Sequence, residues 1–221
     1  MKNILIYGAS GHAKMIVDVI KKNNSHNIMG FIDTYKPLGY QLSNYKVIGH
    51  REHLKQLSID LNIEGIIIAI GDNFTRQKVS DNIRRILPNI QFETVVHPTA
   101  TLAGDIIIEE GSVIMAKAVI NAGAKVGKFC IINTASTLGH DSVMADYSSL
   151  ASGVTIAGTV KIGFCSAICL RSIIIQNVEI GNNTVIGAGS LVLQSIGDLK
   201  LAYGNPVKII KDRKVDSKYL S

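Results

Sequence analysis

A six-residue period runs through the chain from Val96 to Val192. Every sixth position in this span holds an aliphatic residue, seventeen times in succession. A second register, two residues before these positions, holds Ala, Ser, Thr, Cys or Val at fifteen of sixteen sites. A fixed period indicates a repeat architecture and has to be interpreted before local propensities. The pattern predicts a parallel β-helix in which three repeats make one triangular coil. The aliphatic residues then fill the core, and the small residues fit at the corners.

Composition narrows the class of protein. The net charge of +6 suits anionic small ligands such as nucleotides, and it equally suits plain solubility. We expect no nucleic-acid partner, because there is no arginine-rich or aromatic stripe. No apolar run approaches the roughly 18 residues of a membrane span, and the N-terminus does not resemble a signal peptide. We therefore expect a cytoplasmic protein without a membrane partner. The three cysteines do not suggest a disulfide framework, and Cys130 falls in the small inward register.

Residues 1–88 lack the period and predict a small α/β domain. Apolar runs at 4–7, 28–32 and 66–70 predict buried strands, and helical spacing predicts helices over 13–22 and 74–86, with a weaker one over 50–57. This alternation predicts a small parallel, Rossmann-like sheet. We assign residues 1–88 to this domain, 89–195 to the β-helix and 196–221 to a C-terminal tail. We expect the chain to leave the repeat after Val192.

The ends of the three predicted strands carry the first candidate site. A glycine-containing turn between a strand and a helix presents backbone N–H groups that hold phosphates. Parallel sheets bind ligands beyond the carboxyl ends of their strands, and an acid near the second strand suits a ribose or base. We therefore predict one nucleotide-sized, substrate-binding pocket lined by Gly8, Ser10, Gly11, His12, Ala13, Asp33, Gly71, Asp72 and Asn73.

Two other interpretations of these turns remain open. Glycine and aspartate are common in ordinary turns between strands and helices, so the residues could be structural. A dinucleotide fingerprint fits only loosely, since Ser10 and Ala13 stand where two glycines would be. A full NAD site would also need a larger domain than about 90 residues.

His140 is the second candidate site. It lies two residues after Leu138, beyond a predicted corner and pointing away from the prism. An exposed imidazole can act as a general base near neutral pH, with Asp141 as its orienting acid and Asn133 nearby in the coil. A plain surface histidine is the alternative. His97, at the start of the first coil, is more simply a structural cap. We predict no metal, because two repeat histidines do not supply the three ligands of a catalytic zinc site.

A third candidate site is diffuse. Glycines at 158, 163, 181, 187 and 189 would leave the outer wall of the later coils open to a long, thin ligand. Lys208, Lys211, Arg213 and Lys214 could meet its phosphates. The alternatives are corners that need a positive φ and a solvated basic tail.

Several of these motifs together resemble one known family. They are the six-residue repeat, Gly8 to Lys14, Phe31-Ile32-Asp33, Gly71-Asp72-Asn73, Asn133 to Asp141 and Gly204 to Lys208. The chain resembles the bacterial sugar O/N-acyltransferases of the sialic acid O-acetyltransferase type, which include acetyltransferases of 4-amino sugar nucleotides. The resemblance implies a left-handed β-helix, a homotrimer, acetyl-CoA between neighbouring prisms and a nucleotide sugar on the N-terminal domain.

The resemblance also implies roles for individual residues. His140 matches the general base and Asp141 the acid after it. Gly158 matches a glycine beside the thioester, and Leu170, Gly187 and Lys208 would flank the cofactor. The chain departs from the family at Ser149 and Ser152, where His and Pro are common. It also departs at 168–173, a bulkier stretch than the usual glycine-rich coil.

The function implied is acetyl-CoA-dependent N-acetylation of a nucleotide-linked 4-amino-4,6-dideoxy sugar in bacterial glycan biosynthesis. Two alternatives remain. One is O-acetylation of a sugar hydroxyl such as that of a sialic acid. The other is a catalytically weak trimer that binds sugar nucleotides, which the departures at Ser149 and Arg171 favour.

Overall fold

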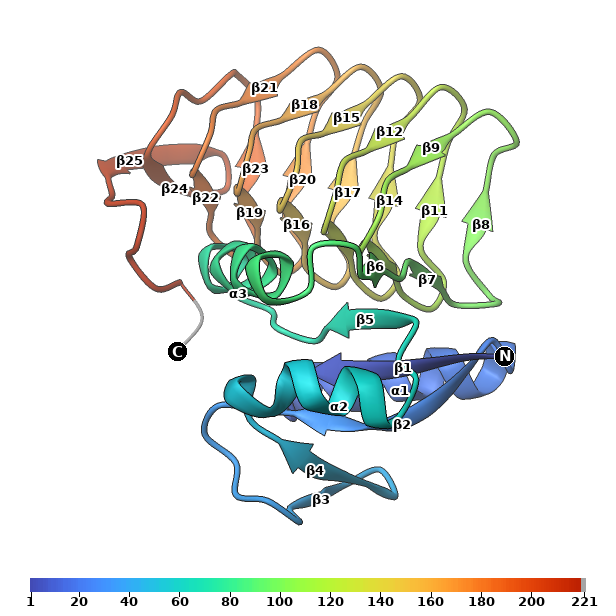
Figure 1. Ribbon diagram of the computed structural model, residues 1–221. Coiled ribbons are helices and arrows are strands. Elements are labelled where there is room, and N and C mark those ends of the chain that lie inside the picture. The colour runs from blue at the N-terminus through green and yellow to red at the C-terminus, as the bar shows by residue number, and fades with distance from the viewer. Residues whose placement is uncertain (220–221) are drawn as a thin grey trace.

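The computed structural model describes residues 1–219 and contains two stacked parts (Figure 1). The N-terminal part is a six-stranded sheet in the order β3-β4-β2-β1-β5-β6. The second part is a triangular prism of short parallel strands, which lies along one side of the first. The expected α/β domain and left-handed β-helix are confirmed. Within residues 1–219, no helix is long and apolar enough to cross a bilayer.

The N-terminal sheet contains the three predicted strands and three further strands. Its strands are β1 (Lys2–Tyr7), β2 (His26–Ile32), β3 (Gln41–Leu42), β4 (Tyr45–Gly49), β5 (Gly65–Ile68) and β6 (Gln91–Phe92). β3 and β4 form a hairpin inside the segment predicted as a polar loop. Ser43 and Asn44 both have positive φ angles, 48° and 70°, as a tight two-residue hairpin turn requires.

Helices cover both faces of this sheet. They are α1 (Gly11–Asn23), α2 (Leu54–Asp60), preceded by the 3₁₀ turn η1 (Arg51–His53), and α3 (Asn73–Ile86). One face packs against α1, whose Ile16 and Ile20 are buried with Ile4 and Ile6 of β1. The other face packs against α2 and α3 through Leu54 and Ile83. Both clusters include residues of the prism, so the two parts share a core.

The prism has three faces, which we name by the order in which the chain meets them. The first face contains β7 (Val95–Val96), β10 (Val113–Ile114), β13 (Ile131–Ile132), β16 (Ser149–Leu150), β19 (Ala167–Ile168) and β22 (Val185–Ile186). The second contains β8 (Thr101–Leu102), β11 (Val119–Ile120), β14 (Thr137–Leu138), β17 (Thr155–Ile156), β20 (Ile173–Ile174) and β23 (Leu191–Val192). The third contains β9 (Ile107–Ile108), β12 (Lys125–Val126), β15 (Val143–Met144), β18 (Lys161–Ile162) and β21 (Glu179–Ile180).

The two registers of the repeat have the predicted places. From Ile114 onward, the aliphatic register is almost completely buried in one continuous core. The small register is buried too, and its hydroxyl groups connect coils. The Ser142 hydroxyl, for example, donates to the carbonyl of Ala157 and accepts from the amide of Val160 on the next coil, both at 3.0 Å. A larger side chain would not fit there, and an apolar one would leave that amide without its partner.

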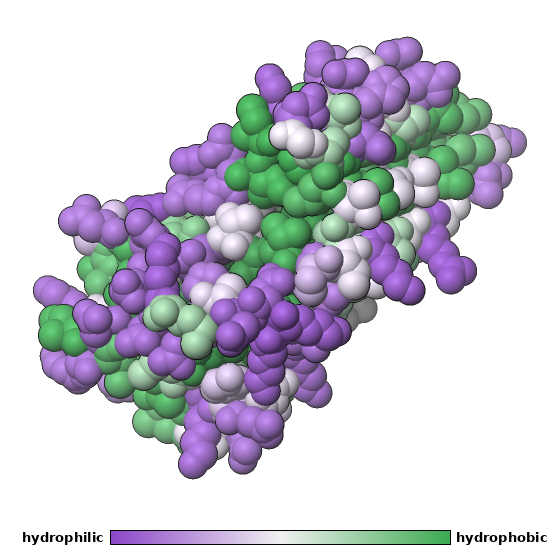
Figure 2. Space-filling view, turned by 90° about the vertical axis from the view of Figure 1, so that its right-hand side faces the viewer, coloured by the Kyte–Doolittle hydropathy of each residue, from purple (hydrophilic) through white to green (hydrophobic). Residues whose placement is uncertain are grey.

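The first coil forms an open end of the prism. Figure 2 faces this end and shows hydrophobic residues gathered on it. Leu102 of the aliphatic register remains 37% exposed, whereas its equivalents in the next two coils, Ile120 and Leu138, are buried. Ile107 is 47% exposed, like its outward-facing equivalent Val143 in the third face.

The prism continues beyond its predicted end. β24 (Lys200–Gly204) pairs with β22 in parallel, and Ile196 bridges to Ile180, so the chain makes a further partial coil after Val192. The basic segment after Pro206 is a strand, β25 (Val207–Asp212), which pairs with β24 in an antiparallel hairpin. The six-residue period ends at Val192 because residues 193–199 form an irregular corner. The backbone hydrogen bonds between successive coils nevertheless continue beyond this corner.

A buried arginine joins the two parts of the chain. Arg76 of α3 is 1% exposed and donates five hydrogen bonds. Two go to corner carbonyls of the prism, those of Phe129 at 2.8 Å and Tyr147 at 2.9 Å. Two go to the carbonyls of Ile70 and Gly71, just after β5. Burial lowers the pKa of the guanidinium. The charge is therefore balanced by carbonyl dipoles, which makes Arg76 the main polar link between the parts.

We predict that Arg76→Ala strongly destabilises the fold. The substitution leaves several buried carbonyls without donors, and each costs about 1–3 kcal/mol, so the free energy of unfolding should fall by about 3 kcal/mol or more. Urea denaturation measures this change. Arg85→Ala is the matched control, because Arg85 lies on the same helix but is exposed, and its loss should cost less than about 0.5 kcal/mol. Similar losses in the two variants would contradict the role of Arg76.

Candidate active site

His140 lies at a corner of the prism, between β14 and β15. Its Nδ1 is 2.8 Å from Oδ2 of Asp141, and both side chains are 65% exposed. A carboxylate can only accept, so Nδ1 carries the proton and Nε2 is left with its lone pair. Asp141 takes the left-handed conformation at this corner, with φ of 57°. The pair therefore presents an imidazole with a free ring nitrogen to the solvent, at the exposed corner that the sequence predicted.

The coils above and below hold this pair in place. The amide of Asp141 donates to the carbonyl of Ala122 on the preceding coil, and the carbonyl of His140 accepts from Thr159 on the following one. Gly158 lies directly beside the imidazole, where a β-carbon on residue 158 would overlap Nε2 of His140. Glycine at this position leaves room for the base.

Most of the glycines of the later coils, at 158, 163, 181, 187 and 189, likewise stand where a β-carbon would have no room. The alternative of a positive φ holds for Gly189, with φ of 67°, and for none of the other four. At 163, 181 and 187 an added β-carbon would meet atoms of the next coil, such as Cβ of Tyr203 beside Gly187. Corner geometry is therefore the wrong explanation for most of them, because here the coils approach each other too closely for a side chain.

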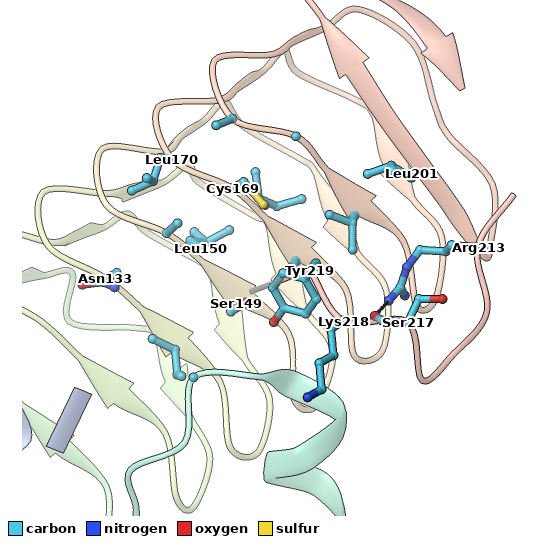
Figure 3. Close-up of a pocket in the computed structure, with 18 of the residues that line it drawn as sticks. Asn133, Ser149, Leu150, Cys169, Leu170, Leu201, Arg213, Ser217, Lys218 and Tyr219 are labelled. Carbon is cyan, nitrogen blue, oxygen red and sulfur yellow. Dashed lines mark hydrogen bonds between the residues drawn. The ribbon is translucent and has the colours of Figure 1, made fainter. Parts of the chain in front are cut away.

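A cavity of about 1100 Å³ lies between the two parts of the chain (Figure 3). The first face of the prism supplies its floor, including Ser149, Ala167 and Val185. The N-terminal part supplies His12 and Gly71, and the segment after β25 supplies a third wall that includes Tyr219. The floor is mainly apolar, and Arg213, Lys214 and Lys218 add positive charge at the side.

The predicted prism residues divide into two groups. Asn133, Leu170 and Gly187 line the cavity on or next to the first face. His140 and Gly158 lie one corner further along the chain, across the second face. Lys208 projects from the exposed strand β25, and it is not among the described residues that line the cavity. Within one chain, the structure therefore does not bring Asn133 and His140 together.

The residues predicted at the strand ends also separate. His12 and Gly71 line the cavity, whereas the Asp33 carboxylate accepts from the amides of Ala9, Tyr35 and Lys36 at 2.7–2.9 Å. This carboxylate closes the turn after β1, where Gly8 has φ of 104°. Ser10 is the N-cap of α1, and Gly11 and Ala13 lie in the first turn of that helix.

Asp72 and Asn73, the last two residues of the predicted substrate pocket, hold the start of α3 in place. Asp72 caps the helix, because its side chain accepts from the amide of Thr75. Asn73 is fully buried and donates to the carbonyls of Ser166 and Cys165, so it anchors α3 to the prism.

His12 is the most unusual of the cavity residues. Its Nε2 is buried and has no hydrogen-bond partner in the described chain, although the residue as a whole is partly exposed. Burial, followed by the nearby charge of Arg76, lowers the pKa of His12 to about 4. The imidazole is therefore neutral at physiological pH. An unsatisfied, neutral ring nitrogen at a cavity wall is suited to a hydrogen bond with a ligand.

Sequence reasoning missed two groups around the cavity. Arg76 binds carbonyls, which no sequence pattern marks. Tyr219 lies beyond the basic segment, and only the path of the chain after β25 brings it back to the first face (Figure 3). No group of three or more His, Cys, Asp or Glu residues that could hold a metal occurs among residues 1–219.

Comparison with known proteins gives one consistent result. The family model described as the PglD N-terminal domain matches residues 3–83. The GDP-perosamine N-acetyltransferase of Escherichia coli O157:H7 is 24% identical over 204 residues, covering 90% of this chain and 81% of that protein. The UDP-N-acetylbacillosamine N-acetyltransferase of Bacillus subtilis is 31% identical over 116 residues, or 52% of each chain.

A solved structure agrees over nearly the whole length. PerB from Caulobacter crescentus, in complex with CoA and GDP-perosamine, has a TM-score of 0.88 and 28% identity, and the match covers 96% of this chain and 98% of PerB. The sequence resemblance, the fold and these relatives lead to the same assignment. The chain is similar over nearly its whole length to hexapeptide-repeat sugar acetyltransferases.

Proposed function

We propose that the chain transfers the acetyl group of acetyl-CoA to the amine of a nucleotide-linked 4-amino-4,6-dideoxy sugar. The observation that carries this proposal is the exposed His140–Asp141 pair, with Nδ1 bonded and Nε2 free. The relatives named for GDP-perosamine and UDP-N-acetylbacillosamine support an amine of a sugar nucleotide as the acceptor. The reaction then belongs to bacterial glycan biosynthesis in the cytoplasm.

In the proposed reaction, Nε2 of His140 takes a proton from the sugar amine as its nitrogen attacks the thioester carbon. A C–N bond forms, the C–S bond breaks, and the departing sulfur recovers the proton. Asp141 holds the imidazole in the required tautomer and stabilises its charged form. General base catalysis accounts for about 10²–10⁴-fold of the rate, and positioning of the two substrates supplies much of the rest.

We further propose that the active site is completed by a second copy of the chain, in a homotrimer. In a single chain, the second face separates His140 at one corner from the cavity edge at Asn133, which lies at the preceding corner. A neighbouring prism would bring its His140 to the cavity edge near Asn133. Acetyl-CoA would then lie between prisms, beside Gly158 of one copy and Leu170 and Gly187 of the other, with Lys208 within reach of its phosphates.

Within this site, we assign the sugar nucleotide to the wall formed by the N-terminal part. Gly8, Ser10, Gly11 and Ala13 present the start of α1, which suits a diphosphate. His12 offers its unsatisfied ring nitrogen from the same turn. Asp33, Asp72 and Asn73 hold the strand ends in position.

The substrate class is tested by measuring free-thiol release from acetyl-CoA. A panel of UDP-, GDP- and dTDP-linked 4-amino sugars, with free sialic acid added, separates the candidates. We expect release with an amino sugar nucleotide. Release only with sialic acid would move the assignment to O-acetylation. No release in a protein that still binds the nucleotides would favour the non-catalytic alternative.

Two substitutions test the base. His140→Ala should lower kcat by at least about 100-fold and leave acetyl-CoA binding nearly unchanged. Gly158→Ala should also lower kcat, because the new methyl group displaces the imidazole. Gly104→Ala is the matched control, since Gly104 occupies the same corner three coils earlier and an added β-carbon there meets nothing within 4 Å. Unchanged turnover in His140→Ala would remove His140 from the mechanism.

A pH dependence of stability follows from the buried state of His12. Its pKa is about 4 in the folded chain and 6.5 when unfolded, so the unfolded state binds more protons between these values. The contribution is fully present above pH 6.5 and is lost as the pH falls through about 4. Between pH 7.5 and pH 4.5, the free energy of unfolding of the wild type should fall by about 2–3 kcal/mol more than that of His12→Asn. Urea unfolding at the two pH values measures this difference. Parallel stability curves for the two proteins would contradict a buried, neutral His12.

A further inference from the structure

The C-terminal segment returns to the cavity after leaving β25. Residues 213–219 run along the open side of the first face, and the Tyr219 ring points into the cavity (Figure 3). Two hydrogen bonds of Arg213 hold the start of this segment, one to the carbonyl of Asn183 at 2.6 Å and one to that of Ser217. The segment is therefore attached to the prism at one end, and Tyr219 makes the contact at the other.

The Tyr219 hydroxyl joins the C-terminal segment to the N-terminal part of the chain. It accepts a hydrogen bond from the backbone amide of Asn73, at 3.2 Å, which is at the start of α3. Ser149 of the first face lines the same cavity. Burial raises the pKa of Tyr219 to about 12, so the phenol keeps its proton at physiological pH. One neutral hydroxyl thus connects the C-terminal segment to the start of α3.

The wall that this contact holds in place is chemically different from the floor. Ala167, Val185 and Leu201 make the floor apolar, whereas Lys214 and Lys218 of the segment border the same cavity with their ammonium groups. An apolar floor beside a cationic wall suits a ligand with an apolar or neutral arm and a diphosphate. Coenzyme A and a nucleotide sugar both have a diphosphate of this kind.

We propose that Tyr219 is a positioning residue: its hydroxyl latches the 213–219 segment onto Asn73 at the start of α3, closing the cavity over a diphosphate-bearing ligand. Opening the latch exposes the first face and moves the lysines away from the cavity. The identity of the ligand rests on the proposed function, whereas the latch itself is a property of the chain alone. A test that needs no turnover can therefore separate the two.

The native cysteines supply such a test. Cys169 lines the cavity on the first face, so its reaction with N-ethylmaleimide reports opening of the segment. Cys130 is fully buried in the prism core, so its reaction in the same sample reports global unfolding. Peptide mapping by mass spectrometry gives the two rates separately in the full-length protein.

Tyr219→Phe should raise the Cys169 labelling rate by about fivefold and leave the Cys130 rate unchanged, the factor expected for one net hydrogen bond. Removal of residues 219–221 should raise it further, whereas removal of 220–221 alone should not. Tyr45→Phe is the matched control, because Tyr45 lies on β4, away from the cavity-lining residues. Equal rates in wild type, Tyr219→Phe and the 219–221 deletion would overturn the latch. So would a proportional rise at Cys130, which would mean general destabilisation.

Labelling in the presence of added ligands identifies what binds beneath the segment. Coenzyme A and GDP are added separately, and the one that binds there should slow Cys169 labelling in wild type and less so in Tyr219→Phe. In the kinetic assay, Tyr219→Phe should raise the KM of that same substrate several-fold with a smaller change in kcat. Protection by neither probe would overturn the assignment of a diphosphate ligand, while the labelling result for the latch would stand on its own.

Discussion

Hydrogen bonds between residues about eighteen positions apart determine where every functional group of the prism lies. Each coil repeats the backbone path of the coil before it, so a residue is placed by its counterparts in the neighbouring turns. The amide of Asp141 and the carbonyl of His140 are both held in this way. The imidazole needs no dense packing around it, because the corner beneath it is rigid and Gly158 provides a flat surface beside it.

The second requirement is a fixed position for the N-terminal part. Arg76 and Asn73 supply it with hydrogen bonds from α3 to four carbonyls of the prism, those of Phe129, Tyr147, Cys165 and Ser166. These contacts place His12 and Gly71 opposite the first face and so create the cavity. The same helix start also receives Tyr219. The position of the cavity and the cohesion of the two parts therefore depend on the same few residues at the beginning of α3.

The sequence was most informative where a pattern repeats. The six-residue period predicted the coils, their buried registers and the exposed corner of His140. It was less informative where contacts are unique. The β3–β4 hairpin depends on two residues with positive φ that are neither glycine nor proline, and the last partial coil lacks the period although its hydrogen bonds remain. The partners of Arg76 are backbone carbonyls, which have no sequence signature. Asp33 was expected to face a ligand, but its carboxylate is already satisfied by three amides.

The stacked coils also act as a ruler. Neighbouring strands are separated by about 4.8 Å, so the distance from the Arg76 junction to any corner is a whole number of such steps. Inserting or deleting eighteen residues would preserve the core and every corner while moving His140 by one step relative to the N-terminal part. A shorter insertion would instead rotate the histidine to another face. Length variation in this architecture is therefore quantised, and the reach between acyl donor and acceptor can change only in units of one coil.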